Sequence, residues 1–308
     1  MNADVVDLLA IGETMALITP APGRSLAAEG AARIGFGGAE SNVAAGVVAG
    51  GGRAAWLSAV GDDPFGELIV AGLRARGVDT AAVRVDPTRP TGLMLKQPGA
   101  AGSRVLYYRA GSAAAALSPA DLGRLPPARV VHTSGITAAL SSSCRELVAH
   151  VLDGAAGDAV VSFDVNHRPA LWPSLEEAAS TLLDLARRAH IVFVGRDEAE
   201  RLWGTVTAEA AHELLPDVPH LVVKDGEVEA VEFGAAGVSR IPAHHVEVVE
   251  PVGAGDAFAA GWLSAWLSGL DAPARLQAGH DGAAAVLRST DDLPPASAGG
   301  MSPMREAS

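Results

Sequence analysis

Short apolar stretches alternate with amphipathic stretches along most of this chain. Each apolar stretch has the length of a strand buried on both faces of a sheet, and the segments between them have helical periodicity. This alternation predicts an α/β fold in which helices cover both faces of a mostly parallel sheet. The predicted strands are Leu8 to Ile11, Ala54 to Val60, Arg129 to Thr133, Ala159 to Asp164, Ile191 to Val194 and Leu221 to Val223.

Two of the predicted helices have clear end signals. Asp63 and the first-position Pro64 begin a helix that runs to Arg76 and stops at Gly77. The other helix, Leu175 to Ala189, has acidic residues in its first turn, where they favour a helix N-terminus.

Two segments, at about 13–36 and 90–112, interrupt the alternation. Within the second segment, Leu93 to Lys96 and Val105 to Tyr108 have strand patterns on either side of a glycine-containing turn. We expect the two segments to form a small β lid beside the main sheet. The exposed edges of such a lid predict a homo-oligomer that pairs through it.

Composition limits the partners and the compartment. A chain of 308 residues with 49% hydrophobic content can build one large core, which we assign to residues 1–293, and a flexible tail rich in Pro, Ser and Gly is expected at 294–308. The formal net charge of -13 disfavours binding to nucleic acid or to anionic membranes, and no apolar run approaches membrane-spanning length. A single cysteine, Cys144, excludes an internal disulfide and predicts the cytoplasm.

A turn of small residues leads into the last long apolar helix. Gly253, Ala254 and Gly255 leave the backbone uncovered, so amides at the helix N-terminus can bind a phosphate. Asp256 follows at once, where a carboxylate would repel the phosphate but could take a proton from an attacking hydroxyl. The alternative is that Asp256 only caps the helix. We interpret the segment as an anion hole with a general base, which points to phosphoryl transfer.

This helix start, together with a second motif, resembles the paired signatures of the ribokinase-like (PfkB) carbohydrate kinases. The second motif is Gly37 to Ala44, with the sequence Gly-Gly-Ala-Glu-Ser-Asn-Val-Ala. Within the family the chain is most similar to 2-keto-3-deoxygluconate kinases, through Tyr107 to Ala114 and Phe163 to Pro173. The resemblance implies a ribokinase-like three-layer sandwich that binds ATP and Mg²⁺, with a monovalent cation as a further candidate.

The resemblance also implies a set of site residues. The expected catalytic residues are Gly253, Ala254, Gly255 and Asp256. The expected substrate contacts are Gly38, Ala39, Glu40, Ser41, Asn42, Met94, Tyr107, Tyr108, Arg109, Arg168, Glu250 and Asp256. The expected nucleotide contacts are Asn166, Arg168, Lys224, Gly226, Gly253 and Gly255, and Glu198 is expected to support magnesium through water.

Physical reasoning supports a sugar acid as the substrate. Its carboxylate must be paired before it is buried in an acidic protein, and the planar fork of Arg109 suits that task. Each candidate has a plainer alternative: a solvated charge for Arg109, a surface loop residue for Arg168 and a strand-end charge for Lys224. Likewise, Gly38 and Asn42 could be an ordinary turn and helix cap.

Three departures from the family pattern bear on the site. Glu250 stands where the family has Asp before a Thr-rich turn, which here reads Pro251 and Val252. Gly195 replaces the Asn of an Asn-x-x-Glu motif, and Glu229 replaces a glycine of the nucleotide loop.

The predicted activity is transfer of phosphate from ATP to the primary hydroxyl of 2-keto-3-deoxygluconate, which gives 2-keto-3-deoxy-6-phosphogluconate. A kinase of a neutral sugar such as fructose or ribose is the nearest alternative. A nucleoside kinase and a ligand sensor that has lost catalysis are the others.

Overall fold

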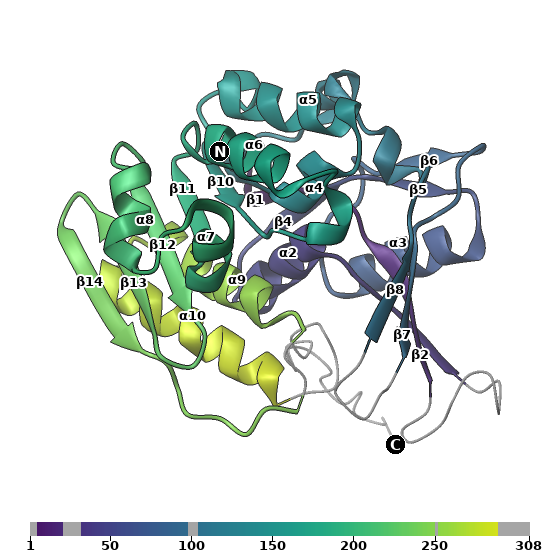
Figure 1. The fold of residues 1–308 in the computed structure, drawn as a ribbon. Helices are drawn as coiled ribbons and strands as arrows, with labels where there is room; N and C mark the ends of the chain where they lie inside the picture. The colour runs from purple at the N-terminus through teal and green to yellow at the C-terminus, as the bar shows by residue number, and fades with distance from the viewer. Residues whose placement is uncertain (1–4, 21–31, 98–103, 250–251, 289–308) are drawn as a thin grey trace, which may run out of the picture.

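The structure, a computed structural model, describes residues 5–20, 32–97, 104–249 and 252–288 (Figure 1). Its largest sheet has eight strands in the order β14-β13-β12-β11-β10-β9-β1-β4. The six strands from β12 to β4 are parallel, and β13 and β14 extend the sheet as antiparallel strands. The bounds are β1 (Val6–Ile11), β4 (Ala54–Leu57), β9 (Ala128–Ser134), β10 (Val160–Asp164), β11 (Ile191–Gly195), β12 (His220–Asp225), β13 (Glu229–Gly234) and β14 (Gly237–Pro242).

Helices cover both faces of this sheet, as predicted. Leu8 and Ala10 of β1 pack into one core cluster, whereas Leu9 and Ile11 pack into the other, because successive strand residues point to opposite faces. The first face carries α2 (Ala39–Ala49), α3 (Pro64–Ala75), α9 (Ala254–Leu267) and α10 (Ala272–Leu287). The second carries α4 (Gly135–Ala139), α5 (Ser142–His150), α6 (Leu175–Ala186), α7 (Arg196–Trp203) and α8 (Ala208–Leu214). The three-layer prediction is confirmed.

The predicted lid is a separate sheet of four strands in the order β3-β2-β7-β8, which projects from one end of the molecule (Figure 1). Its strands are β2 (Met15–Pro20), β3 (Ala32–Gly37), β7 (Leu93–Gln97) and β8 (Arg104–Tyr108). The two strands predicted in the second lid segment agree with β7 and β8 to within one residue.

The single strand predicted from Ala54 to Val60 is wrong. The structure divides it into β4 and β5 (Ala59–Gly61), which pairs with β6 (Arg84–Asp86) in a sheet of its own. The chain leaves the main sheet at the buried Ser58, and an apolar run does not reveal that change of partner.

The predicted helix ends are nearly correct. The Asp63 side chain accepts hydrogen bonds from two backbone amides at the start of α3, and Arg76 is the C-cap. Helix α6 ends at Ala186, three residues before the predicted end. Four short helical turns complete the described elements: η1 (Ala114–Ala116), η2 (Pro119–Arg124), η3 (Val151–Ala155) and η4 (Pro169–Leu171).

The domain boundary predicted at residue 293 and the tail predicted at 294–308 lie outside the described residues. Within the part that the structure describes, no helix is long and apolar enough to cross a membrane.

Candidate functional site

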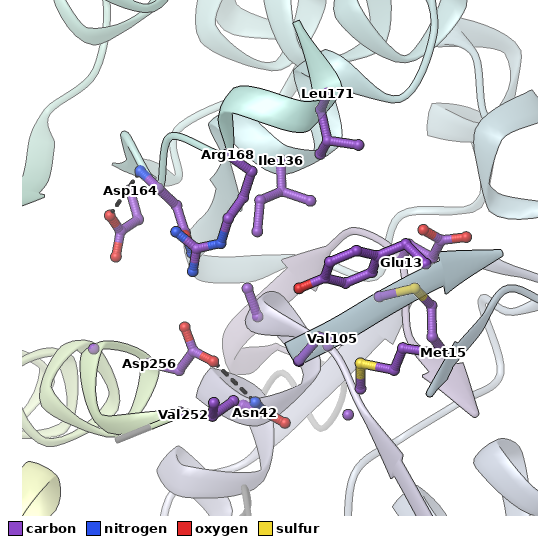
Figure 2. A pocket seen from close by; sticks show the side chains of 18 of the residues that line it. Glu13, Met15, Asn42, Val105, Ile136, Asp164, Arg168, Leu171, Val252 and Asp256 are labelled. Atoms are coloured by element: carbon purple, nitrogen blue, oxygen red, sulfur yellow. Dashed lines mark hydrogen bonds between the residues drawn. The ribbon is translucent and has the colours of Figure 1, made fainter. Parts of the chain in front are cut away.

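A cavity of about 470 Å³ lies between the carboxyl edge of the main sheet and the lid (Figure 2). Asp164 and Gly195 are the last residues of the adjacent strands β10 and β11, Lys224 is the last residue but one of β12, and all three line the cavity. Ligands of doubly wound sheets bind at this edge. The starts of α2 and α9 line the cavity too, so the two motifs of the sequence meet there although more than 200 residues separate them.

The start of α9 has the geometry of an anion site. Gly253 is its N-cap with φ 83°, a left-handed conformation that favours glycine. The amide of Ala257 donates to Gly253 O, so the amides of Ala254, Gly255 and Asp256 come before the first hydrogen bond of the helix. Gly253, Gly255 and Asp256 line the cavity, and Ala254 does not. Since Gly253 is the cap residue, Asp256 does not cap this helix.

Asp256 is held by one side chain and influenced by several charges. Asn42 Nδ2 donates to Asp256 Oδ2 over 2.8 Å. Burial, with a smaller contribution from the neighbouring Asp164, raises the pKa of Asp256 to about 7 against the hydrogen bond from Asn42 and the positive charges of Arg168 and Lys224. A carboxylate with a pKa near neutrality can accept a proton from a hydroxyl and release it again.

Lys224 forms an ion pair at the carboxyl edge, with Nζ 2.9 Å from Asp164 Oδ2. Burial opposes its charge, but Asp164 and Glu198 outweigh burial and raise the pKa of Lys224. Lys224 is therefore a paired charge at the end of β12, and its contact with a nucleotide stays a prediction. The ammonium group also lies near the anion site, since a Cβ placed on Gly255 would be 3.6 Å from Nζ.

Glu198 lines the cavity from the first turn of α7. Its Oε1 accepts from the amide of His167 at 2.5 Å and its Oε2 from the amide of Gly195 at 2.9 Å. Burial and the neighbouring Asp164 raise the pKa of Glu198. The described residues contain no cluster of three His, Cys, Asp or Glu side chains that could enclose a metal ion. Mg²⁺ often keeps several waters and uses one or two carboxylates together with substrate phosphates, and Asp164 and Glu198 fit that mode.

The lid presents one face of each strand to the cavity. The lining side chains alternate along β2, β7 and β8, as strand geometry requires; they are Met15, Leu17, Met94, Lys96, Val105 and Tyr107. Tyr108 is 60% exposed and lies outside this lining, because it follows Tyr107 on the opposite face of β8.

Arg109 lines the cavity but is already paired. Its Nε donates to Glu13 Oε2 over 2.6 Å, its Nη2 lies 2.5 Å from the same oxygen, and Ser112 Oγ donates to Glu13 Oε1 over 2.5 Å. Both members of the ion pair are buried. The alternative of a solvated charge is thus excluded, and the N–H groups that Glu13 leaves unused can still meet a ligand.

The Gly38 to Asn42 segment divides between cavity and core. Gly38, Ala39 and Asn42 line the cavity, and a Cβ on Gly38 would come within 2.2 Å of Glu13 O. Glu40 and Ser41 are fully buried outside the lining.

The buried Glu40 accepts hydrogen bonds from Ser134 and Thr137, and burial raises its pKa. Ser41 donates to Gly38 O over 3.1 Å. Neither side chain is placed to touch a ligand in the cavity.

The remaining predicted residues are mostly at the site. Asn166 has a left-handed φ of 38° and lines the cavity together with Arg168, whose side chain points into it (Figure 2). Gly226, at φ 51°, forms the turn after β12 and is not part of the lining. Glu250 lies outside the described residues.

Glu13, Lys96 and Asp164 line the cavity although the sequence did not single them out. Asp164 had a usable signal, since it is the last residue of a predicted strand in a parallel sheet. Glu13 and Lys96 had none, because their role depends on how the lid folds over the sheet.

Residues 6–297 match the model of the pfkB family carbohydrate kinases. The chain belongs to this family. It is therefore a phosphotransferase that uses an alcohol group as acceptor, as predicted, and the ribokinase-like fold assignment is confirmed.

Several curated relatives of this carbohydrate kinase are close in length. A 2-dehydro-3-deoxygluconokinase of Thermoproteus tenax is 37% identical over 278 residues, which cover 87% of this chain and 84% of the relative. The 2-dehydro-3-deoxygluconokinase of Bacillus subtilis (strain 168) is 35% identical over 296 residues, covering 94% and 91%. Fructokinase-1 of Oryza sativa subsp. japonica is 35% identical over 229 residues, covering 72% and 71%.

Solved structures agree with the fold. A PfkB protein from Polaromonas sp. JS666 superposes with a TM-score of 0.83 at 33% identity, covering 91% of this kinase and 95% of that chain. An E. coli structure solved in complex with ATP and Mg²⁺ has a TM-score of 0.83 at 23% identity, covering 94% and 95%.

Proposed function

We propose that this kinase transfers the terminal phosphoryl group of ATP to the primary hydroxyl of 2-keto-3-deoxygluconate, also called 2-dehydro-3-deoxygluconate. The observation that carries the proposal is the position of Asp256. Its carboxylate stands beside the amides at the start of α9 and faces a cavity whose lining also includes Arg109 and Arg168. The similarity to two 2-dehydro-3-deoxygluconokinases supports the choice of sugar.

In the proposed reaction, Asp256 takes the proton of the primary hydroxyl while the hydroxyl oxygen forms a bond to the terminal phosphorus. The bond between that phosphorus and the bridging oxygen breaks, and ADP leaves with the electron pair. The amides of Ala254, Gly255 and Asp256 stabilise charge on the transferring group, and Lys224 lies close enough to add a positive charge. Mg²⁺, which Asp164 and Glu198 would hold through water, supplies further neutralisation of the phosphates.

The sugar carboxylate is the group that distinguishes this substrate from fructose or ribose. Glu13 balances much of the charge of Arg109, so we expect the carboxylate to bind the free N–H groups of Arg109 and the guanidinium of Arg168 together. Tyr107 and Met94 on the lid then cover the sugar.

A kinase of a neutral sugar is the second candidate, and one observation favours it. The Glu13 and Arg109 pair is neutral as a unit, so it would not penalise an uncharged ligand. The similarity to fructokinase-1 points the same way. A sensor without catalysis fits less well, because Asp256 and the α9 amides are in place.

We also expect two copies of the kinase to pair through the lid. Ile34 on the edge strand β3 of the lid is 52% exposed, which supports pairing of two copies through the lid. A monovalent cation and a cytoplasmic location stay predictions, and Glu250 and Pro251 lie outside the described residues.

The test is ATP turnover measured side by side with 2-keto-3-deoxygluconate, gluconate, fructose and ribose, for the wild type and for Arg109→Ala. We expect turnover of the sugar acid at least tenfold above fructose and ribose, and loss of that preference in the variant. The matched control Arg129→Ala removes an exposed arginine far from the cavity lining and should keep the preference. Faster turnover of fructose or ribose than of the acid would overturn the choice of substrate.

A further inference from the structure

A single side-chain hydrogen bond joins the two motifs of the site. Asn42, in the first turns of α2, donates from Nδ2 to Asp256 Oδ2 near the start of α9, across 214 residues of sequence (Figure 2). Asn42 is 5% exposed and Asp256 is half-buried, so the bond lies at the wall of the cavity, where a ligand can meet both side chains.

Hydrogen bonds in the first turn of α2 hold the backbone at Asn42 in place. Its backbone amide donates to Gly38 O over 2.8 Å, and Ser41 Oγ donates to the same carbonyl. Thr14 Oγ1 then donates to Ser41 Oγ over 2.7 Å, which ties the turn to the connection between β1 and β2. The backbone at Asn42 is thus held by its own helix start, independently of the contact with Asp256.

The other end of the Asn42 side chain has no partner. Within the described residues, Oδ1 is buried without a hydrogen bond, although Asn42 lines the cavity. An ionised Asp256 can only accept hydrogen bonds, so the amide NH₂ must face it and the carbonyl is left over. A buried acceptor without a donor is costly, and a ligand hydroxyl in the cavity would remove that cost.

We propose that Asn42 is the positioning residue of the base: its N–H holds one oxygen of Asp256 so that the other faces the acceptor hydroxyl, while Asn42 Oδ1 remains free for the sugar contact already expected of this residue. This inference rests on the proposed function, in which Asp256 is the base. The charged groups that face Asp256 are Asp164 and Lys224 at the carboxyl edge and Arg168 after β10. Asn42 differs from them because it favours the ionised carboxylate without bringing a charge.

The pH profile of kcat distinguishes this role from a purely structural one. Loss of the Asn42 hydrogen bond removes a contact that lowers the pKa of Asp256, so the acid limb should move upward by about one pH unit in Asn42→Ala. If that limb moves from about 7 to about 8, kcat at pH 7 falls about fivefold, and at pH 9 most of it returns. KM for the sugar should rise at every pH, because the Oδ1 contact is lost as well.

Asn42→Asp is the second variant, nearly identical in shape. It replaces a donor with a second carboxylate beside Asp256, so the acid limb should move further than in Asn42→Ala. This variant keeps the proposal testable if the alanine variant does not fold.

The experiment measures kcat and KM from pH 5.5 to 9.5 with saturating ATP and 2-keto-3-deoxygluconate. Thr14→Val is the matched control, because it loosens the same helix start without touching Asp256 and should leave the acid limb in place. Asp256→Asn tests the base independently of Asn42. Near-normal turnover of Asp256→Asn would show that Asp256 is not the base. If Asp256→Asn is inactive but the acid limb is unshifted in both Asn42 variants, only the role of Asn42 is overturned.

Discussion

Asp256→Asn should stabilise the folded protein at alkaline pH while it removes turnover. Burial is the main cause that raises the pKa of Asp256 from 3.8 to about 7, so the ionised carboxylate is less stable in the folded protein than in the unfolded chain. Each pH unit of that rise corresponds to about 1.4 kcal/mol, which gives about 4 kcal/mol in all. Because Asp256 is only half-buried, solvent reduces the effect, and we expect a measured gain of about 1–3 kcal/mol.

The size of this stabilisation depends on pH. Well below pH 3.8 the carboxyl group is protonated in both states and the variant gains nothing. Between about 4 and 7 the unfolded chain ionises while the folded protein keeps its proton, so the penalty on the wild type grows; above about 7 it is constant. An amide at position 256 can still accept the hydrogen bond from Asn42, so packing changes little.

Urea denaturation of both proteins at pH 5 and pH 8 measures this difference. The free energy of unfolding of Asp256→Asn should exceed that of the wild type by more at pH 8 than at pH 5. Asp184→Asn is the control, since its carboxylate is 70% exposed and its replacement should give a small change at both pH values. Equal stability of Asp256→Asn and the wild type at pH 8 would show that Asp256 is not a destabilised, buried acid.

Other variants test the rest of the site. Glu13→Leu leaves Arg109 buried without its partner and should lower the free energy of unfolding by about 3–5 kcal/mol in urea denaturation; a variant as stable as the wild type would show that the ion pair is dispensable. Gly38→Ala puts a Cβ within 2.2 Å of a backbone oxygen and should cost about 1–3 kcal/mol and raise KM for the sugar, and unchanged values would contradict the close approach. Lys224→Met should weaken ATP binding at least tenfold in calorimetry, whereas unchanged affinity would exclude a phosphate contact.

The main architecture could be predicted from the sequence because it depends on local patterns. Apolar runs of strand length are visible in the chain, and β1, β9, β10, β11 and β12 each lie within two residues of the prediction. The antiparallel β13 and β14 were not predicted. The outermost strand, β14, is mostly exposed and has no apolar run to reveal it.

The site could be predicted only in part. The motif at Gly253 to Asp256 acts through its own backbone, so its residue types suffice to suggest an anion site. The pairing of Arg109 with Glu13, 96 residues away, depends on how the lid meets the main sheet. Glu40 shows the opposite case, since a polar residue inside a binding motif turned out to pack in the core against Ser134 and Thr137.

The most direct test of the central claim is turnover by Asp256→Asn beside the affinity of that variant for the sugar. With saturating ATP and 2-keto-3-deoxygluconate at pH 8, we expect kcat to fall by at least about a thousandfold while the Kd of the sugar changes by no more than a fewfold. That combination requires a side chain that acts on the transfer step rather than on binding. A kcat within tenfold of the wild type would contradict the account.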